Sequence, residues 1–193
     1  TALPQLRQES DIPILGVVEP ACRRAAAVTR NRRVGLIATA ASVRSGAYQR
    51  SLRQLDPDIA VTAKACPLFV PLVENGRFRR GDVVIETVAR EYLEPLRREG
   101  LDTLILGCTH YPLLTDIIGD IMGPGVTLIN TGEEAAWELK RTLRAMDLLA
   151  PEGPAGRATL CASDQPEHFG SLAAYFLGES LTRPVQPVDI DRY

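Results

Sequence analysis

The sequence has few cysteines, few aromatic residues and no long run of apolar residues. Of its 193 residues, only 5% are aromatic and four are cysteine. No two cysteines have the short spacing of a metal site, and the first ten residues do not resemble a secretory signal. No stretch approaches the roughly 18 consecutive apolar residues of a membrane span. With only two histidines, the chain is therefore predicted to be cytoplasmic, with reduced thiols and no bound metal.

The charge of the chain is nearly balanced, with 22 basic and 24 acidic residues. This balance gives no indication of a nucleic-acid partner. Between Pro20 and Leu55, however, there are eight arginines and no acidic residue. They fit either solvated helix faces or a surface that attracts anions. The eight are Arg23, Arg24, Arg30, Arg32, Arg33, Arg44, Arg50 and Arg53.

Short apolar runs alternate with segments of helical periodicity along the chain. This alternation predicts an α/β fold of doubly wound parallel sheets, because the runs are almost continuously apolar, as buried parallel strands are. The predicted strands are residues 12–18, 34–39, 59–64, 103–107, 126–130 and 158–162. The predicted helices are residues 20–29, 42–55, 82–99, 112–122, 132–149 and 166–177, and residues 151–156, rich in Pro and Gly, predict a linker.

In such sheets ligands bind at the carboxyl ends of the strands. Thr39 and Ser42 follow one predicted strand, and Ser42 is expected to cap the next helix. After a later strand, Thr131 and Glu134 have the spacing of a capping box. No GxGxxG motif and no P-loop is present, so neither a dinucleotide nor a nucleoside triphosphate is favoured.

The turn after residue 106 places a thiol, a hydroxyl and an imidazole next to one another as Cys108, Thr109 and His110. A following helix is expected to lower the pKa of Cys108 by stabilising the thiolate. A cysteine at a strand end is also common core filling, and a histidine there can serve as a structural hydrogen-bonding group. Their position at a strand's carboxyl end, together with the hydroxyls of Thr39 and Ser42, favours a functional role.

The run Gly107 to Pro112, GCTHYP, resembles the signature around the second catalytic cysteine of glutamate racemases, in the cofactor-independent aspartate/glutamate racemase superfamily. Other segments of the chain resemble this family in the same order and at the same spacing, so the resemblance covers most of the chain. They are VVEP at 17–20, VRSGAYQ at 43–49, ACPLFVPLVE at 65–74 and DTLILGCTHYP at 102–112.

The resemblance implies a role for each matching residue. Cys108 would be one of two thiols that flank the α-carbon of glutamate, with His110 assisting its proton transfer. Thr109 would hydrogen-bond the substrate. Thr39 and Ser42 would hold the α-carboxylate.

Glu74 corresponds to an acidic residue near the family's site, although a solvated loop carboxylate is an equal interpretation. The other three cysteines are expected to be packing residues. They are Cys22, Cys66 and Cys161.

The resemblance also implies how the chain is divided. Residues 33–126 would form a complete second racemase domain with the GCTHYP motif, and residues 1–32 and 127–193 part of a first domain. The family's Asp-Ser-Gly motif and its first catalytic cysteine, in a Cys-Asn-Thr motif, do not occur in the sequence. We therefore expect this chain alone to be inactive or very weakly active.

The implied activity is interconversion of L- and D-glutamate for peptidoglycan synthesis without a cofactor, and a homodimer is compatible with it. Two alternatives stay open. One is a non-catalytic partner-binding protein, since members of this family have been linked to inhibition of DNA gyrase, with the arginine-rich region as the contact. The other is a flavodoxin-like binder of phosphate or flavin.

Overall fold

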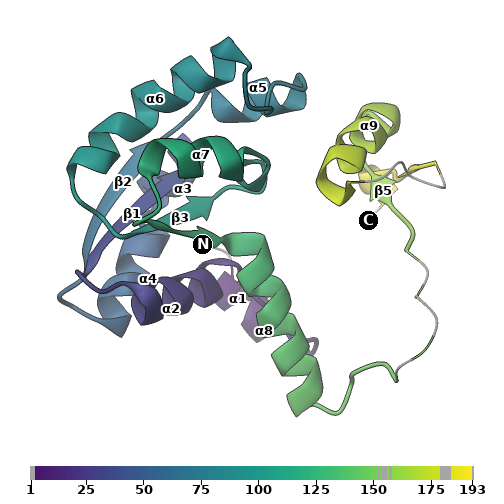
Figure 1. Ribbon diagram of the computed structural model, residues 1–193. Helices are drawn as coiled ribbons and strands as arrows, with labels where there is room; N and C mark the ends of the chain where they lie inside the picture. The colour runs from purple at the N-terminus through teal and green to yellow at the C-terminus, as the bar shows by residue number, and fades with distance from the viewer. Residues whose placement is uncertain (1–2, 152, 154–155, 157, 179–183, 193) are drawn as a thin grey trace. The chain divides into compact units, whose positions relative to one another are not determined.

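Four parallel strands form the sheet at the centre of the larger unit (Figure 1). The computed structural model describes residues 3–151, 153, 156, 158–178 and 184–192, and the chain divides into the units Thr1–Leu149 and Ala150–Tyr193. The strands are β1 (Arg33–Ala38), β2 (Ala60–Ala65), β3 (Thr103–Gly107) and β4 (Thr127–Asn130). Their order in the sheet is β2-β1-β3-β4. The chain thus moves to opposite sides of β1, as in a doubly wound fold.

Helices cover both faces of this sheet (Figure 1). On one face, Leu104 and Leu106 of β3 pack with residues of α5, α6 and α7, and on the other face Ile105 packs with residues of α2 and α4. This alternation is the period of two that a strand buried on both faces requires. The helices of the unit are α1 (Leu3–Glu9), α2 (Val18–Val28), α3 (Ala40–Ser45), α4 (Ala47–Leu55), α5 (Phe69–Glu74), α6 (Val83–Arg98), the 3-10 helix η1 (Tyr111–Leu114), α7 (Thr115–Met122) and α8 (Thr131–Ala145).

Helix α6 shows how the sequence specifies one of these elements. The side chain of Asp82 accepts a hydrogen bond from the amide of Val84, which caps the helix. Its buried residues recur at helical spacing and form one apolar stripe. Gly100, with φ +65°, follows the C-terminus in the left-handed conformation that favours glycine. The buried residues are Ile85, Ala89, Tyr92, Leu93 and Leu96.

The strands predicted around residues 34–39, 59–64, 103–107 and 126–130 are confirmed as β1 to β4. The strand predicted at 12–18 is wrong: residues 11–17 are irregular and α2 begins at Val18. Pro13 has no amide to donate, and the side chain of Ile12 is 75% exposed. The apolar run therefore lacks the pairing and the burial that make a strand.

The predicted helix at 42–55 is two helices, because Gly46 lies between α3 and α4 with φ +64°. The cap of α3 is Thr39 rather than Ser42: the Thr39 hydroxyl accepts from the amide of Ser42. Ser42 lies too far into the first turn of α3 to cap it.

The capping box expected at Thr131 and Glu134 is also wrong. Asn130 caps α8 by accepting from the amides of Gly132 and Glu133. The Thr131 hydroxyl is buried and donates to the carbonyl of Leu106 in β3. The Thr131 side chain therefore bonds to the sheet and does not cap α8, whose cap is the preceding residue, Asn130.

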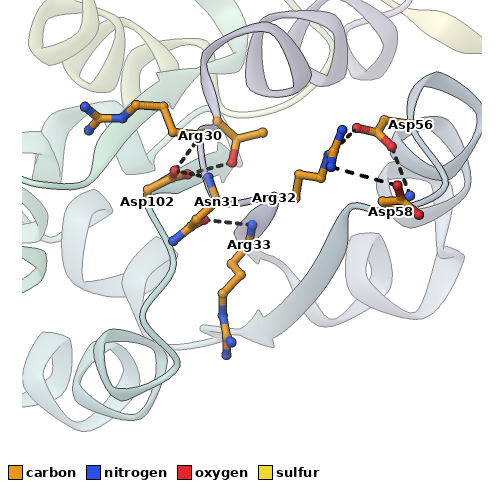
Figure 2. A network of polar contacts seen from close by, with 8 residues as sticks. Arg30, Asn31, Arg32, Arg33, Asp56, Asp58 and Asp102 are labelled. Carbon is orange, nitrogen blue, oxygen red and sulfur yellow. Dashed lines mark hydrogen bonds and ion pairs between the residues drawn. The ribbon is translucent and has the colours of Figure 1, made fainter.

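Asp102 holds the turn between α2 and β1 at the amino edge of the sheet (Figure 2). Its carboxylate accepts from the Thr29 hydroxyl at 2.6 Å and from the amides of Arg30 and Asn31 at 2.7 and 2.8 Å. Partial burial acts to raise the pKa of Asp102, but these hydrogen bonds, with one from Thr103, bring it below its ordinary value. One carboxylate therefore anchors three consecutive residues of the turn.

The smaller unit contains β5 (Cys161–Ala162), α9 (Pro166–Leu177), β6 (Gln186–Pro187) and the 3-10 helix η2 (Ile190–Arg192). Strands β5 and β6 pair in parallel, and no residue of α9 is buried. The helix predicted at 166–177 is confirmed, whereas the strand predicted at 158–162 is limited to its last two residues. Half of the linker predicted at 151–156, residues 152, 154 and 155, lies outside the described residues. In the described part of the chain, no helix is both long enough and apolar enough to cross a membrane.

Candidate functional site

The candidate site begins at the junction of β1 and β3, the two central strands. Ala38 pairs with Gly107 at their carboxyl ends. The next residues, Thr39 and Cys108, therefore leave the sheet from neighbouring positions, with the strands about 4.8 Å apart. Because the chain runs from β1 to β2 on one side and β3 lies on the other, this junction is the topological switch point, where α/β sheets bind ligands.

Gly107 allows the two strands to approach each other at this edge. A Cβ atom at Gly107 would lie 3.0 Å from the carbonyl oxygen of Ile37 and 3.1 Å from the Cβ of Ala38. Both neighbours belong to β1, and the backbone carbonyl cannot move aside as a flexible side chain can. The glycine of the GCTHYP motif therefore sets the position from which Cys108 leaves the sheet.

His110 contacts both residues that precede it. Its Nδ1 lies 3.9 Å from Sγ of Cys108 and 3.2 Å from Oγ1 of Thr109. The turn continues directly into η1, and the amide of Tyr111 donates to the carbonyl of Cys108. The three residues that the sequence places together are thus folded into a single tight turn.

Glu74 is the last residue of α5, and its Oε1 lies 3.1 Å from Nε2 of His110. The side chains of His110 and Glu74 are 18% and 36% exposed. A carboxylate only accepts hydrogen bonds, so Nε2 of His110 carries the proton that faces Glu74. In the neutral imidazole this leaves Nδ1 as an acceptor for the Cys108 thiol. Of the two interpretations of Glu74, the structure favours the one in which it faces the site.

Thr39 and Ser42 supply hydroxyl groups from the neighbouring turn. The Thr39 hydroxyl donates to Oγ of Ser42 at 3.1 Å while it accepts from the Ser42 amide at 3.3 Å. Both side chains are partly buried. The two hydroxyls thus form a fixed pair after β1, next to the turn that carries the thiol.

Burial raises the pKa of the Cys108 thiol, and the negative charge of Glu74 adds to this effect. Hydrogen bonds from the His110 and Thr109 amides and from the Thr109 side chain act in the opposite direction without overcoming it. The expectation of a lowered pKa is therefore wrong. The cause is that a partly buried thiol loses more solvation of its charged form than one short 3-10 turn restores.

The other cysteines differ in their surroundings. Cys22 and Cys66 are fully buried, as expected of packing residues, and burial raises their pKa values to about 11 and about 12. Cys161 is exposed in β5, so its assignment to packing is wrong. β5 has only two residues and neither is buried. The apolar sequence at residues 158–162 did not indicate this exposure. Among the described residues, no three His, Cys, Asp or Glu side chains gather as a metal site would require.

Carboxylates of other segments pair with several arginines of the 20–55 region. Arg23 lies 2.9 Å from Glu138 and Arg24 3.7 Å from Glu134, both on α8. These pairs are partly exposed and contribute little stability. They favour the interpretation of solvated helix faces over an anion-binding surface. Two further pairs of this kind are Arg32 with Asp56 and Arg33 with Glu99.

Comparison with known proteins identifies the family. The Asp/Glu/hydantoin racemase model matches residues 1–139. The glutamate racemase of Geobacter metallireducens is 45% identical over 93% of this chain and 66% of its own length. The chain thus spans about two thirds of the length of such a relative.

Comparison with solved structures points to the same family. Glutamate racemase from Thermus thermophilus, in complex with β-chloro-D-alanine, is 46% identical with a TM-score of 0.84 over 99% of this chain and 68% of that one. The enzyme from Francisella tularensis, in complex with D-glutamate, is 30% identical with a TM-score of 0.85 over 98% of this chain and 70% of that one. The chain therefore belongs to the Asp/Glu/hydantoin racemase family.

Proposed function

We propose that this chain carries one half of the active site of a glutamate racemase, with Cys108 as the group that exchanges a proton with the α-carbon. The observation that carries the proposal is the chain of contacts from Glu74 through His110 to Cys108, at the switch point of the sheet. The D-glutamate complex of the relative from Francisella tularensis supports glutamate as the substrate.

The raised pKa of Cys108 is useful for this reaction. The α-proton of an amino acid is far less acidic than a thiol, so a thiolate of higher pKa is the stronger base for removing it. The raised pKa also means that less thiolate is present near neutral pH. His110 compensates by accepting the thiol proton at Nδ1, and Glu74 stabilises the imidazolium that results.

Thr39 and Ser42 are proposed to bind the α-carboxylate, and Thr109 to hydrogen-bond the substrate beside the thiol. Fixed donors at the carboxylate stabilise the negative charge that develops as the α-proton leaves. The partly buried position of the site limits competition from water. The reaction as proposed needs no cofactor.

Racemisation requires a second acid–base group on the opposite face of the α-carbon. Cys22 and Cys66 are fully buried, and no cysteine of the chain, exposed Cys161 included, stands in the Cys-Asn-Thr motif that holds the first catalytic thiol in the family. We propose that the second thiol lies outside these 193 residues, and that residues 33–126 form the second racemase domain and residues 1–32 and 127–193 belong to the first. This chain alone is then expected not to interconvert the two enantiomers.

The test is incubation of the chain with L- or D-glutamate in deuterated water, followed by NMR and by chiral analysis. The expected result is no interconversion, with slow loss of the α-proton from one enantiomer only. That exchange disappears in Cys108→Ala and persists in Cys161→Ala, the matched control. Full racemisation by the chain would overturn the half-site assignment, and exchange that persists in Cys108→Ala would overturn the role of this thiol.

A cytoplasmic enzyme that supplies D-glutamate for peptidoglycan, working as a homodimer, is part of the same proposal and rests on the resemblance of the sequence to glutamate racemases; the names of the relatives support the racemase activity alone. No observation favours the partner-binding alternative or an interaction with gyrase. The arginines on which that alternative rests include Arg23, Arg24, Arg32 and Arg33, which pair with carboxylates of the same chain.

A further inference from the structure

We propose that Tyr111 is a positioning residue that holds Glu74 against His110, and through this pair sets the proton affinity at Cys108. Tyr111 follows His110 directly and is fully buried. Its hydroxyl bonds to the loop between β2 and α5 rather than to the turn that carries Cys108. The inference rests on the proposed role of Cys108 and adds a residue that determines the geometry of that site.

The hydroxyl of Tyr111 donates to the carbonyl of Cys66 at 2.9 Å. The same carbonyl accepts from the amide of Phe69 at 3.3 Å, at the start of α5. Cys66 is itself fixed to the sheet, since its amide donates to the carbonyl of Ala38 at 3.0 Å. Cys66 thus joins Tyr111 and the first turn of α5 through its carbonyl, and the end of β1 through its amide.

The ring of Tyr111 makes a second contact with the same helix. Its centroid lies 5.2 Å from that of Phe69, and the two rings are perpendicular. Such edge-to-face pairs stabilise packing beyond the effect of the area that they bury. On its other side Phe69 packs edge-on against Tyr92 of α6, with centroids 5.3 Å apart. Phe69 is therefore held between two tyrosines and has little freedom to move.

These contacts determine where Glu74 lies because α5 is short. The helix runs from Phe69 to Glu74, so the residue that Tyr111 fixes is at one end and the carboxylate at the other. Tyr111 also continues the turn that carries His110. A single buried side chain therefore ties together the two segments whose ends meet in the 3.1 Å contact between Glu74 and His110.

The test measures the reactivity of the Cys108 thiol rather than the turnover of glutamate, and therefore does not depend on racemase activity. Cys108 is alkylated with iodoacetamide between about pH 6 and 10, and modification is followed by peptide mass spectrometry with exposed Cys161 as the internal reference. Glu74 lies 3.1 Å from the imidazole and acts on the thiolate only across the ring. Loss of the Glu74 charge therefore weakens His110 as a base more than it reduces the electrostatic repulsion that Glu74 exerts on the Cys108 thiolate. Tyr111→Phe and Glu74→Gln should each slow alkylation of Cys108 near pH 7.5 by about threefold or more.

The double variant distinguishes a positioning role from a structural one. If Tyr111 acts through Glu74, Tyr111→Phe combined with Glu74→Gln alkylates at the rate of Glu74→Gln alone. Additive slowing, or an unchanged rate in Tyr111→Phe, overturns the proposal. Thr29→Val is the matched control, since it removes a hydroxyl hydrogen bond at the opposite edge of the sheet and should leave Cys108 unaffected.

A second variant keeps the test decisive if Tyr111→Phe does not fold. Phe69→Leu retains the hydroxyl bond and removes the ring contact, and it should slow alkylation of Cys108 in the same direction. Circular dichroism shows which variants are folded, and a folded Phe69→Leu with the rate of the unmodified chain refutes the positioning role. Absence of glutamate exchange would refute the proposed function and leave this result unaffected.

Discussion

The carboxylate of Glu74 lies 3.1 Å from Nε2 of His110, although the two residues are 36 positions apart in the sequence. The opposite nitrogen of the ring faces the thiol of Cys108. The imidazole therefore lies between the carboxylate of Glu74, which accepts a hydrogen bond from Nε2, and the thiol of Cys108, which faces Nδ1. In the proposed reaction, this order of groups lets a thiol of raised pKa serve as the base.

Replacement of Glu74 by Gln should reduce the exchange of the glutamate α-proton about tenfold or more, since the imidazolium loses its counter-charge. The measurement is the NMR exchange rate in deuterated water. Glu99→Gln is the matched control, because Glu99 pairs with Arg33 on the surface, where both side chains are 52% exposed. Equal rates in the two variants would show that Glu74 does not act on the site.

Thr39→Val should weaken glutamate binding and also destabilise α3 by about 1 kcal/mol, because the helix loses its cap. Thr39→Ser keeps the hydroxyl and should restore both properties. Binding is measured as the glutamate concentration that halves alkylation of Cys108, and stability as the urea midpoint. If glutamate protects Cys108 from alkylation equally well in Thr39→Val, the Thr39 hydroxyl does not belong to the substrate site.

Gly107→Ala should destabilise the chain by about 1–3 kcal/mol, since the new Cβ meets the carbonyl of Ile37 at 3.0 Å. It should also change the alkylation rate of Cys108, the next residue. Gly125→Ala is the control, as no atom lies within 4 Å of a Cβ there. Urea unfolding of both variants measures the difference, and equal midpoints would contradict the close approach of β1 and β3.

Asp102→Asn should lower stability by about 2 kcal/mol near neutral pH, since four hydrogen bonds lose their charged acceptor. The folded-state pKa of Asp102 lies below its ordinary value. Its contribution is therefore present above the unfolded pKa of about 4 and is lost as pH falls through the folded pKa. The unfolding curves of the two proteins should differ at neutral pH and converge at acidic pH, and a difference that stays constant with pH would contradict this origin.

The sequence predicted the central strands well because each is an uninterrupted apolar run bounded by turn residues. It did not predict α5, since Phe69–Glu74 has only six residues and contains Pro71. It missed the break at Gly46, although a glycine within a helical pattern is the one signal available for it.

The candidate site was predicted in part. Thr39, Ser42 and the turn from Cys108 to His110 follow β1 and β3, so a prediction of parallel strands brings them together. The contact between Glu74 and His110 depends on how α5 packs, and the residues alone left Glu74 undecided. The pKa of Cys108 depends on the balance of burial and hydrogen bonding, which spacing does not reveal.

The pairing of β1 with β3 also has a consequence for folding. Thr39 and Cys108 become neighbours through a pairing that closes a loop with α3, α4, β2, α5 and α6 between them. Closing such a long loop costs entropy before the contacts between the strands can offset it, so we expect this pairing to form after the local helices. The hydroxyls that follow β1 and the thiol and imidazole that follow β3 are therefore expected to come together only once these two strands have paired.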